Sequence, residues 1–223
     1  MPQRLKPAAR RLLITAGPTR EMLDPVRFLS NVSTGEMGYA LARMARNRGY
    51  QVTLISGPTG LAAPQGVKYV PIVSAADLQK SCRRLFPLHD ALVMVAAVCD
   101  FTLPAQHHHK IRRTKVHHLR LEQTPDIVAA LAARKGKRKV IGFCLETENW
   151  MENAAAKLKR KHLDGIVANY YSKKHVPFGR RRIDTAFLSK EGTVTLRRKS
   201  KVQIALALLK WMESLGKKNI SKD

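Results

Sequence analysis

The stretch DPVRFLSNVSTGEMGYA, residues 24–40, gathers side chains that proteins use to bind anions. Ser33 and Thr34 carry hydroxyl groups, and Gly35 and Gly38 lie where a helix-like pattern begins. The N–H groups at a helix start attract phosphate, and glycine permits close approach of the backbone to a ligand or of the helix to a sheet. The stretch matches neither a G-x-G-x-x-G fingerprint nor a Walker A loop. An anion site and an ordinary helix start both remain compatible with it.

Lys110, Arg112 and Arg113 in the segment HHHKIRR, residues 107–113, form the densest candidate for a triphosphate clamp. Lys110 and Arg112 could clamp a triphosphate, because a lysine on a flap can close over a nucleotide and neutralise developing charge. A solvated basic loop is the alternative. The histidines at 107–109 and 117–118 match no zinc spacing, and neighbouring residues of an extended segment point to opposite sides. We predict no metal site.

Two lysines and one cysteine offer further chemistry. Lys157 and Lys161 lie four residues apart on one helix face, where like charges repel unless an anion lies between them. A solvated face is the alternative. Cys99 precedes Asp100 and could be a nucleophile, but no histidine partner can be assigned. We predict that Cys99 is a small buried apolar residue.

The hydrophobic pattern predicts alternating strands and helices that would position these residues. We expect strands at residues 12–14, 51–56, 67–73, 91–100, 139–144 and 165–168, and a hairpin of 185–189 and 193–196. We expect helices at residues 37–48, 75–86, 125–134, 152–161 and 201–215. Ser74 should cap the second helix, and Thr124 the third, with Pro125 at its first position. The alternation predicts a doubly wound, mainly parallel, Rossmann-like α/β sheet with a C-terminal hairpin and helix.

One segment breaks this alternation. Residues 103–122 are basic, rich in histidine and without helical periodicity, so we expect a flap that leaves the sheet. We expect the run 91–100 to be a central strand, buried on both faces. We treat residues 1–223 as one domain with a disordered tail at 216–223.

Polar side chains follow the expected strands at one end of the sheet, where ligands of such sheets bind. They are Asn31, Ser33, Thr34, Asp100, Glu146, Glu148 and Asn169. The loops at the opposite end contain nothing comparable, and this asymmetry predicts a site at the carboxyl ends of the strands.

The composition limits the possible classes of protein. The chain has 223 residues, of which 44% are hydrophobic, and a net charge of +25 that favours anionic ligands. No run of apolar residues is long enough for a membrane span. The three cysteines form neither a metal spacing nor a disulfide framework, which favours the reducing cytoplasm.

Six segments share their order and spacing with one family. They are TAGPTREMLDPVRFLSNVSTGEMG, MVAAVCD, KIRR, TPDIVAAL, GFCLETEN and ENAAAKLKRKHLDGIVAN. From about Leu12 to Val202, their combination resembles the phosphopantothenoylcysteine synthetase (phosphopantothenate–cysteine ligase) family of the bacterial, CTP-dependent type.

The resemblance implies a ligase of coenzyme A biosynthesis. The carboxylate of 4'-phosphopantothenate attacks the α-phosphate of CTP, pyrophosphate leaves, and an acyl-cytidylate forms. The amine of cysteine then attacks the acyl carbon, and CMP departs with formation of 4'-phosphopantothenoylcysteine. By resemblance, Lys110 serves the first step from the flap. Asn31 holds the acyl-cytidylate for the second, and we expect its amide to donate to a carbonyl oxygen.

The resemblance also assigns binding residues. The nucleotide-binding positions are Ala96, Ala97, Asp100, Pro125, Asp126, Ile127, Val128, Phe143, Lys157 and Lys161. We assign binding of phosphate or substrate to Gly17, Ser33, Thr34, Gly35, Gly38 and Arg112.

Three positions depart from the family pattern. Pro18 follows Gly17, where the family usually has two glycines before Thr19. Glu36 replaces a lysine and removes one positive charge near the phosphates, and Tyr170 stands where aspartate is common. These departures and the preference for CTP over ATP stay open.

The resemblance implies Mg²⁺ bound with the nucleotide, no FMN, and a homodimer that pairs through the sheet and flap. Many bacterial relatives carry this domain behind a flavin-dependent decarboxylase. We therefore expect either a chain without decarboxylase activity or a piece of such a fusion.

Two other functions fit parts of the sequence. Tyr170 and Lys174 have the Tyr-x-x-x-Lys spacing of an NAD(P)-dependent reductase, but the glycine-rich fingerprint is missing. The charge of +25 fits a nucleic-acid-binding protein, but only 6% of residues are aromatic and none interleave with the basic runs. We expect nucleic-acid binding to be adventitious.

Overall fold

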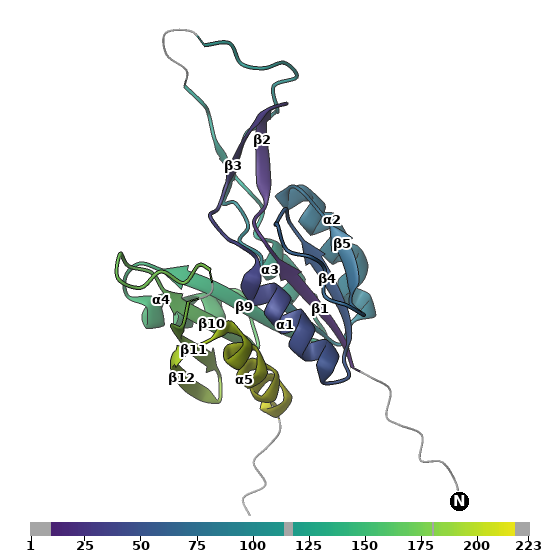
Figure 1. Cartoon of the computed structure of the whole chain (residues 1–223), viewed down its shortest axis with the longest axis vertical. Helices are drawn as coiled ribbons and strands as arrows, with labels where there is room; N and C mark the ends of the chain where they lie inside the picture. The colour runs from purple at the N-terminus through teal and green to yellow at the C-terminus, as the bar shows by residue number, and fades with distance from the viewer. Residues whose placement is uncertain (1–9, 114–117, 180, 217–223) are drawn as a thin grey trace, which may run out of the picture.

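The computed structural model describes residues 10–113, 118–179 and 181–216. Within them, eight strands form one sheet, in the order β12-β11-β10-β9-β6-β1-β4-β5 (Figure 1). The parallel strands are β1 (Arg11–Ala16), β4 (Gln51–Ser56), β5 (Lys68–Pro71), β6 (Ala91–Met94), β9 (Lys139–Glu146) and β10 (Gly165–Tyr170). The antiparallel strands β11 (Ile183–Ser189) and β12 (Gly192–Lys199) complete one edge. The predicted doubly wound sheet with a terminal hairpin is confirmed.

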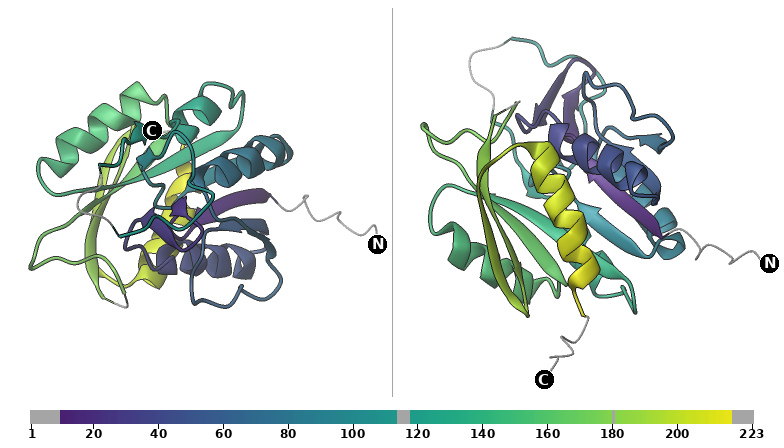
Figure 2. Two further views of the ribbon diagram at one scale, coloured as in Figure 1. Left: turned by 90° about the horizontal axis from the view of Figure 1, so that it is seen from above. Right: turned by 60° about the horizontal axis from the view of Figure 1, so that its bottom comes forward.

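Helices cover both faces of the sheet (Figure 2). One face carries α1 (Glu36–Asn47) and α5 (Lys201–Ser214). The other carries α2 (Ala75–Leu85), the short 3₁₀ helix η1 (Phe86–Leu88), α3 (Ile127–Ala132) and α4 (Trp150–Arg160). Buried side chains alternate along β1 between the two layers, with Leu12 and Ile14 packed toward α1 and Leu13 packed toward α2. The chain reverses its winding direction between β1 and β6, which are neighbours in the sheet.

Most elements differ from their predicted bounds by one to three residues at an end, and two of the differences have a visible cause. The predicted central strand at 91–100 ends at Met94, because the next two N–H groups turn to the hydroxyl of Thr15. The third helix begins at Ile127, and its cap is Asp126, whose carboxylate accepts the N–H of Ala129. The expected cap, Thr124, donates instead to the carbonyl of Cys99 at 2.7 Å.

A projection that the sequence predicted only in part stands above the sheet (Figure 1). Its first part is the hairpin of β2 (Arg20–Asp24) and β3 (Arg27–Ser30), which the prediction treated as part of a junction. Its second part is the predicted flap, whose ends pair as β7 (Phe101–Thr102) and β8 (Glu122–Gln123). We call β2, β3 and residues 101–113 and 118–123 the arm.

Some expectations concern residues outside the described ranges. They include His117 and most of the tail at 216–223, of which only Gly216 is described. Among the described residues, no helix has the length and apolar character needed to cross a membrane. Likewise, no group of three histidine, cysteine or acidic residues in those ranges could hold a metal ion.

Gly38 brings α1 close to the end of β1. A Cβ atom at this position would lie 2.5 Å from Ala16 Cβ and 3.0 Å from Thr15 O. The sequence left open whether this glycine serves a ligand or the packing of helix on sheet. The geometry assigns it to the packing.

Replacement of Gly38 by alanine should therefore destabilise the fold by about 1–3 kcal/mol, because the helix must shift away from β1. Helix propensity alone predicts the opposite sign, a gain of about 1 kcal/mol. Urea unfolding would measure the difference. The control is Gly60→Ala, whose new Cβ would meet nothing within 4 Å. A Gly38→Ala variant as stable as the wild type would contradict the packing role.

Candidate active site

The loops that follow β1 and β6 are bound to each other at the carboxyl edge of the sheet. Thr15 is fully buried, and its hydroxyl accepts the N–H groups of Val95 and Ala96 at 3.1 and 3.0 Å. The N–H of Ala97 then donates to Gly17 O at 2.9 Å. Both loops are thus fixed at the point where the winding reverses, which is where ligands of such sheets bind.

A pocket of about 180 Å³ opens at the start of α1, and we call it the helix pocket. Among the residues that line it are Gly17, Ser33, Thr34, Gly35 and Gly38, all predicted to bind phosphate or substrate. Gly35 precedes α1 with a φ of 77°, a conformation that favours glycine, and it supplies no side-chain cap to the helix. The pocket therefore offers uncapped helix N–H groups to an anion.

An adjoining pocket of about 780 Å³ lies beside α3 and α4, and we call it the large pocket. It is lined by every residue predicted to bind the nucleotide: Ala96, Ala97, Asp100, Pro125, Asp126, Ile127, Val128, Phe143, Lys157 and Lys161. Ser33, Phe143 and Phe178 line both pockets, so the two form one continuous site. The structure thus brings together segments that lie far apart in the sequence.

Lys157 of α4 and Lys161, which caps the C-terminus of that helix, each have a carboxylate partner. Lys157 Nζ lies 2.5 Å from Glu146 Oε1 at the end of β9, and Lys161 Nζ lies 2.9 Å from Asp126 Oδ2 at the start of α3. These ion pairs answer the question of how two like charges share one helix face. They hold both ammonium groups at the large pocket, where a polyanion would compete with the carboxylates.

Asn31 lines the large pocket, with its amide oriented by the loop after β6. Its Nδ2 donates to Ala97 O and to Val98 O, both at 3.0 Å. Both amide hydrogens are therefore engaged, and Oδ1 is the atom that Asn31 can offer to a ligand. The amide was expected to donate to a carbonyl oxygen, but this geometry makes Asn31 an acceptor.

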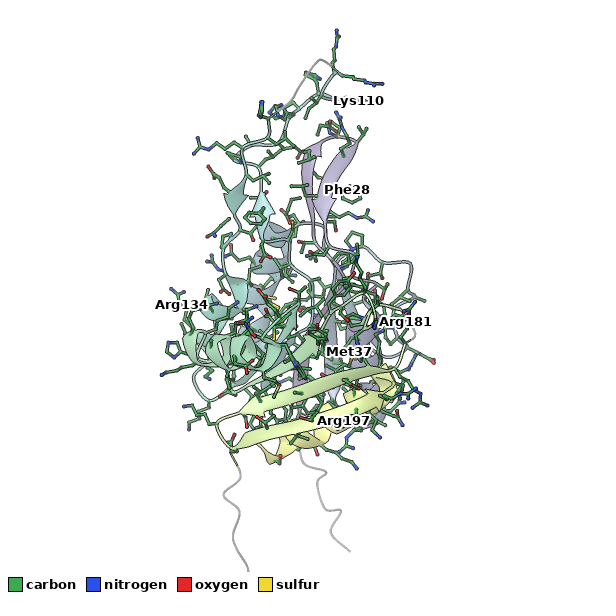
Figure 3. All side chains as sticks on the ribbon, turned by 90° about the vertical axis from the view of Figure 1, so that its left-hand side faces the viewer. Phe28, Met37, Lys110, Arg134, Arg181 and Arg197 are labelled. Atoms are coloured by element: carbon green, nitrogen blue, oxygen red, sulfur yellow. The ribbon has the colours of Figure 1, made fainter. Side chains whose placement is uncertain are left out.

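Lys110 and Arg112 do not line either pocket. Figure 3 shows Lys110 at the tip of the arm, well away from Met37 of the helix pocket. Within one chain, the structure does not bring the predicted flap lysine to the other site residues.

The motif DPVR, at the turn between β2 and β3, clamps the flap next to Lys110. The side chain of Asp24 is fully buried, and it accepts the N–H of Ile111 at 3.1 Å and that of Val26 at 2.9 Å. Arg27 donates from Nε to Asp24 at 2.8 Å and from Nη2 to Ile111 O at 2.7 Å. Burial raises the pKa of Asp24, but the hydrogen bonds that it accepts outweigh burial and hold the pKa well below its ordinary value.

Sequence reasoning assigned no role to several side chains of the helix pocket, among them those of Phe178 and Lys201. Phe178 comes from the loop after β10, and Lys201 is the first residue of α5. Lys201 lies in no motif that signals binding, and the position of both side chains follows from the packing of the C-terminal elements. Asn169, which the sequence did single out, also lines this pocket, and its Oδ1 has no hydrogen-bond partner within the described residues.

The chain matches the family model of the DNA/pantothenate metabolism flavoprotein C-terminal domain over residues 8–215. The chain belongs to this family. It is 38% identical over 209 residues to the coenzyme A biosynthesis bifunctional protein CoaBC of Bacillus subtilis. The aligned residues make up 92% of this chain and 52% of the relative. The chain thus spans about half the length of the curated relatives it matches.

Solved structures of the DNA/pantothenate metabolism flavoprotein family have the same fold. The crystal structure of the C-terminal domain of a coenzyme A biosynthesis bifunctional protein CoaBC is 37% identical, with a TM-score of 0.78 over 92% of this chain and 94% of that one. The DNA/pantothenate metabolism flavoprotein from Streptococcus pneumoniae is 25% identical, with a TM-score of 0.81 over 92% of this chain and 99% of that one.

The family membership and the geometry remove the support for a reductase. Tyr170 ends β10, and Lys174 lies in the turn that follows, so the pair does not share a helix. The cysteines are buried and free, as predicted for Cys99. Burial raises the pKa of Cys144 to about 11 and that of Cys82 to about 12, so neither is poised as a thiolate nucleophile.

We predict that Asp24→Asn loosens the flap, because the neutral amide cannot accept the full set of hydrogen bonds. The N–H of Ile111 should exchange with solvent faster than in the wild type, measured by hydrogen exchange at pH 7. Because the pKa of Asp24 is lower in the folded than in the unfolded protein, the stability that the clamp contributes is fully present above the unfolded pKa, about 4. This contribution is lost as the pH falls from there through the lower pKa of the folded state. The wild type should therefore still protect Ile111 at pH 4.

The matched control for this measurement is Asp184→Asn, since Asp184 accepts the N–H of Arg198 on the far edge of the sheet at 2.6 Å. This variant should leave the exchange of Ile111 unchanged. Equal exchange rates in Asp24→Asn and the wild type would refute the clamp.

Proposed function

We propose that the chain joins 4'-phosphopantothenate and cysteine through an acyl-cytidylate, releasing pyrophosphate and CMP and forming 4'-phosphopantothenoylcysteine. The observation that carries the proposal is the continuous site, in which the helix pocket adjoins a large pocket lined by all the predicted nucleotide-binding residues. The relatives named as coenzyme A biosynthesis bifunctional proteins support the same pathway. The likeness to the isolated C-terminal domain of one of them supports the ligase step.

In the first half-reaction, a carboxylate oxygen of phosphopantothenate attacks the α-phosphorus of CTP, and the bond to pyrophosphate breaks. The triphosphate of CTP and the attacking carboxylate bring several negative charges together, so the site must supply cations and N–H donors. Lys157, Lys161 and the start of α1 meet this need. Lys110 would add a further cation when the flap covers a bound nucleotide.

In the second half-reaction, the amine of cysteine attacks the acyl carbon, the bond to CMP breaks, and the amine loses a proton. Asn31 Oδ1 is suited to accept an N–H of that amine, because its own Nδ2 is engaged by two carbonyl oxygens. This role orients the nucleophile and differs from the donor role expected from the sequence.

CTP and Mg²⁺ are part of the proposal. The carboxylates of Glu146 and Asp126 are engaged by lysines, so a magnesium ion fits this site as one bound mainly by phosphate oxygens. It would supply charge neutralisation of the nucleotide. The three buried free cysteines suit a reducing cytoplasm. Binding of nucleic acid to the basic surface would be adventitious.

We further propose a homodimer formed through the arm. Several apolar side chains of the arm and its base are exposed: Val26 by 59%, Phe28 by 42%, Phe101 by 49%, Leu119 by 40% and Leu121 by 42%. Such a concentration on a projecting element favours a protein partner. A second copy seated on the arm would also place a site near the flap lysine, which one chain alone does not do.

The division of roles predicts different failures in two variants. Lys110→Gln should reduce pyrophosphate release from CTP and phosphopantothenate by about 100-fold, because a cation is lost from the transition state. Asn31→Asp should release pyrophosphate once and then stall before the amide forms, because a carboxylate facing two carbonyl oxygens cannot keep this orientation.

Pyrophosphate and amide product would be measured in parallel, with ATP in place of CTP as the test of nucleotide preference. Lys137→Gln, at an exposed lysine outside both pockets, is the control. Loss of the same step in both variants would overturn the assignment of roles. A wild type that releases no pyrophosphate with either nucleotide would overturn the proposed function.

The dimer has its own test. Val26→Asp should convert the protein to a monomer in sedimentation velocity and lower its activity, because a charge would be buried in the interface. The control is Val194→Asp, since Val194 is 44% exposed on β12, away from the arm. A wild type that sediments as a monomer across micromolar concentrations would exclude the arm interface.

A further inference from the structure

Lys201 lines the helix pocket beside the start of α1. It is the first residue of α5, directly after the cap Ser200, and its side chain is only 11% exposed. Its Nζ lies 3.1 Å from Glu36 Oε2, at the first residue of α1, and also contacts Gly179 O. Both charged side chains line the pocket. The ion pair therefore lies inside the helix pocket.

The two partners differ in how they suit their own helices. A carboxylate at the first position of α1 interacts favourably with the positive end of the helix dipole, whereas an ammonium group at the first position of α5 opposes it. The charge of Lys201 is thus not stabilised by the dipole of its own helix. The favourable partner for its charge is in the pocket, at present Glu36.

Lys201 is also the basic side chain of the pocket. Of the described residues that line it, no other is basic, and the titratable neighbours are Glu36 and Cys144. The N–H groups at the start of α1 have no side-chain cap, and Asn169 contributes a buried Oδ1 that has no hydrogen-bond partner among the described residues. Besides the carboxylate of Glu36, the pocket thus holds one ammonium group, several N–H donors and one unpaired acceptor. Once the carboxylate is displaced, the other groups suit a phosphate group with an adjoining N–H or O–H.

We propose that Lys201 binds the phosphate group that enters the helix pocket. Glu36 is the counter-ion that holds the Lys201 ammonium group in the pocket until the phosphate displaces the Glu36 carboxylate. The inference rests on the proposed function, whose two phosphate-bearing substrates are CTP and 4'-phosphopantothenate. Lys201 is then a substrate-binding residue, and Glu36 a competitor for the same ammonium group.

This arrangement predicts opposite effects from the two ends of one ion pair. Lys201→Met removes the cation that binds the phosphate, so the KM of the substrate concerned should rise about ten-fold or more with little change in kcat. Glu36→Gln removes the competitor and a repelling charge, so the same KM should fall or stay equal. Lys201→Arg keeps the charge and should retain most of the affinity.

The experiment measures kcat and the KM of CTP and of phosphopantothenate separately for the wild type and the three variants, together with their melting temperatures. A change confined to the KM of CTP assigns the pocket to the triphosphate, and one confined to phosphopantothenate assigns it to that substrate's phosphate. The control is Lys135→Met, which breaks the Lys135–Asp164 pair of 2.8 Å outside both pockets and should leave both KM values unchanged.

A purely structural ion pair would behave differently. Both Lys201→Met and Glu36→Gln would then lower the melting temperature and leave both KM values unchanged, and this result would overturn the proposal. If the wild type releases no pyrophosphate, the proposed function fails, and calorimetric titration with CTP and with phosphopantothenate decides the inference. Weaker binding of one of them to Lys201→Met than to the wild type supports it, and equal binding of both overturns it.

Discussion

The site depends on the hydrogen bonds that join the loop after β1 to the loop after β6. Thr15 ends one strand, and its buried hydroxyl takes the N–H groups that would otherwise extend β6. The backbone that follows is thereby turned across the edge of the sheet, and its carbonyl groups orient the amide of Asn31. The buried hydroxyl of Thr15 thus ends β6 at the point where the winding reverses, and the loops diverge there to leave space for a ligand.

Charge in the site is balanced before any ligand arrives. The chain has 16 acidic against 41 basic residues, and three of the acidic ones hold lysines at the two pockets. Because a partly buried lysine without a partner is costly, the carboxylates stabilise the site and orient the ammonium groups. The electrostatic part of the binding free energy of a polyanion is then a difference. The lysines gain ion pairs with the ligand and lose their ion pairs with the carboxylates. This constraint limits affinity, and it favours release of charged products.

Much of this organisation was predictable from the sequence. Hydrophobic periodicity and the polar residues that follow a strand can both be recognised within short stretches of the chain. The alternation of strands and helices predicted the sheet, and the polar residues after its strands predicted where the pockets lie. The hairpin of β2 and β3 escaped prediction, since its short strands carry mixed polar and apolar residues with no clear alternation. Lys201 escaped because its partner Glu36 lies 165 residues away, a contact that only the packing of α5 against α1 creates.

The clamp at Asp24 limits how the flap can act. Because Ile111 is bonded to the hairpin through its N–H and its carbonyl, the residue next to Lys110 cannot swing independently of β2 and β3. A lysine on a freely hinged loop could fold back onto its own site, but one anchored to a rigid hairpin keeps its distance from the sheet. The functional partner of this lysine must then come to the arm, through bending of the whole arm or through a second copy of the chain. The exposed apolar side chains along the arm favour a second copy of the chain, because bending of the arm alone would leave these side chains in water.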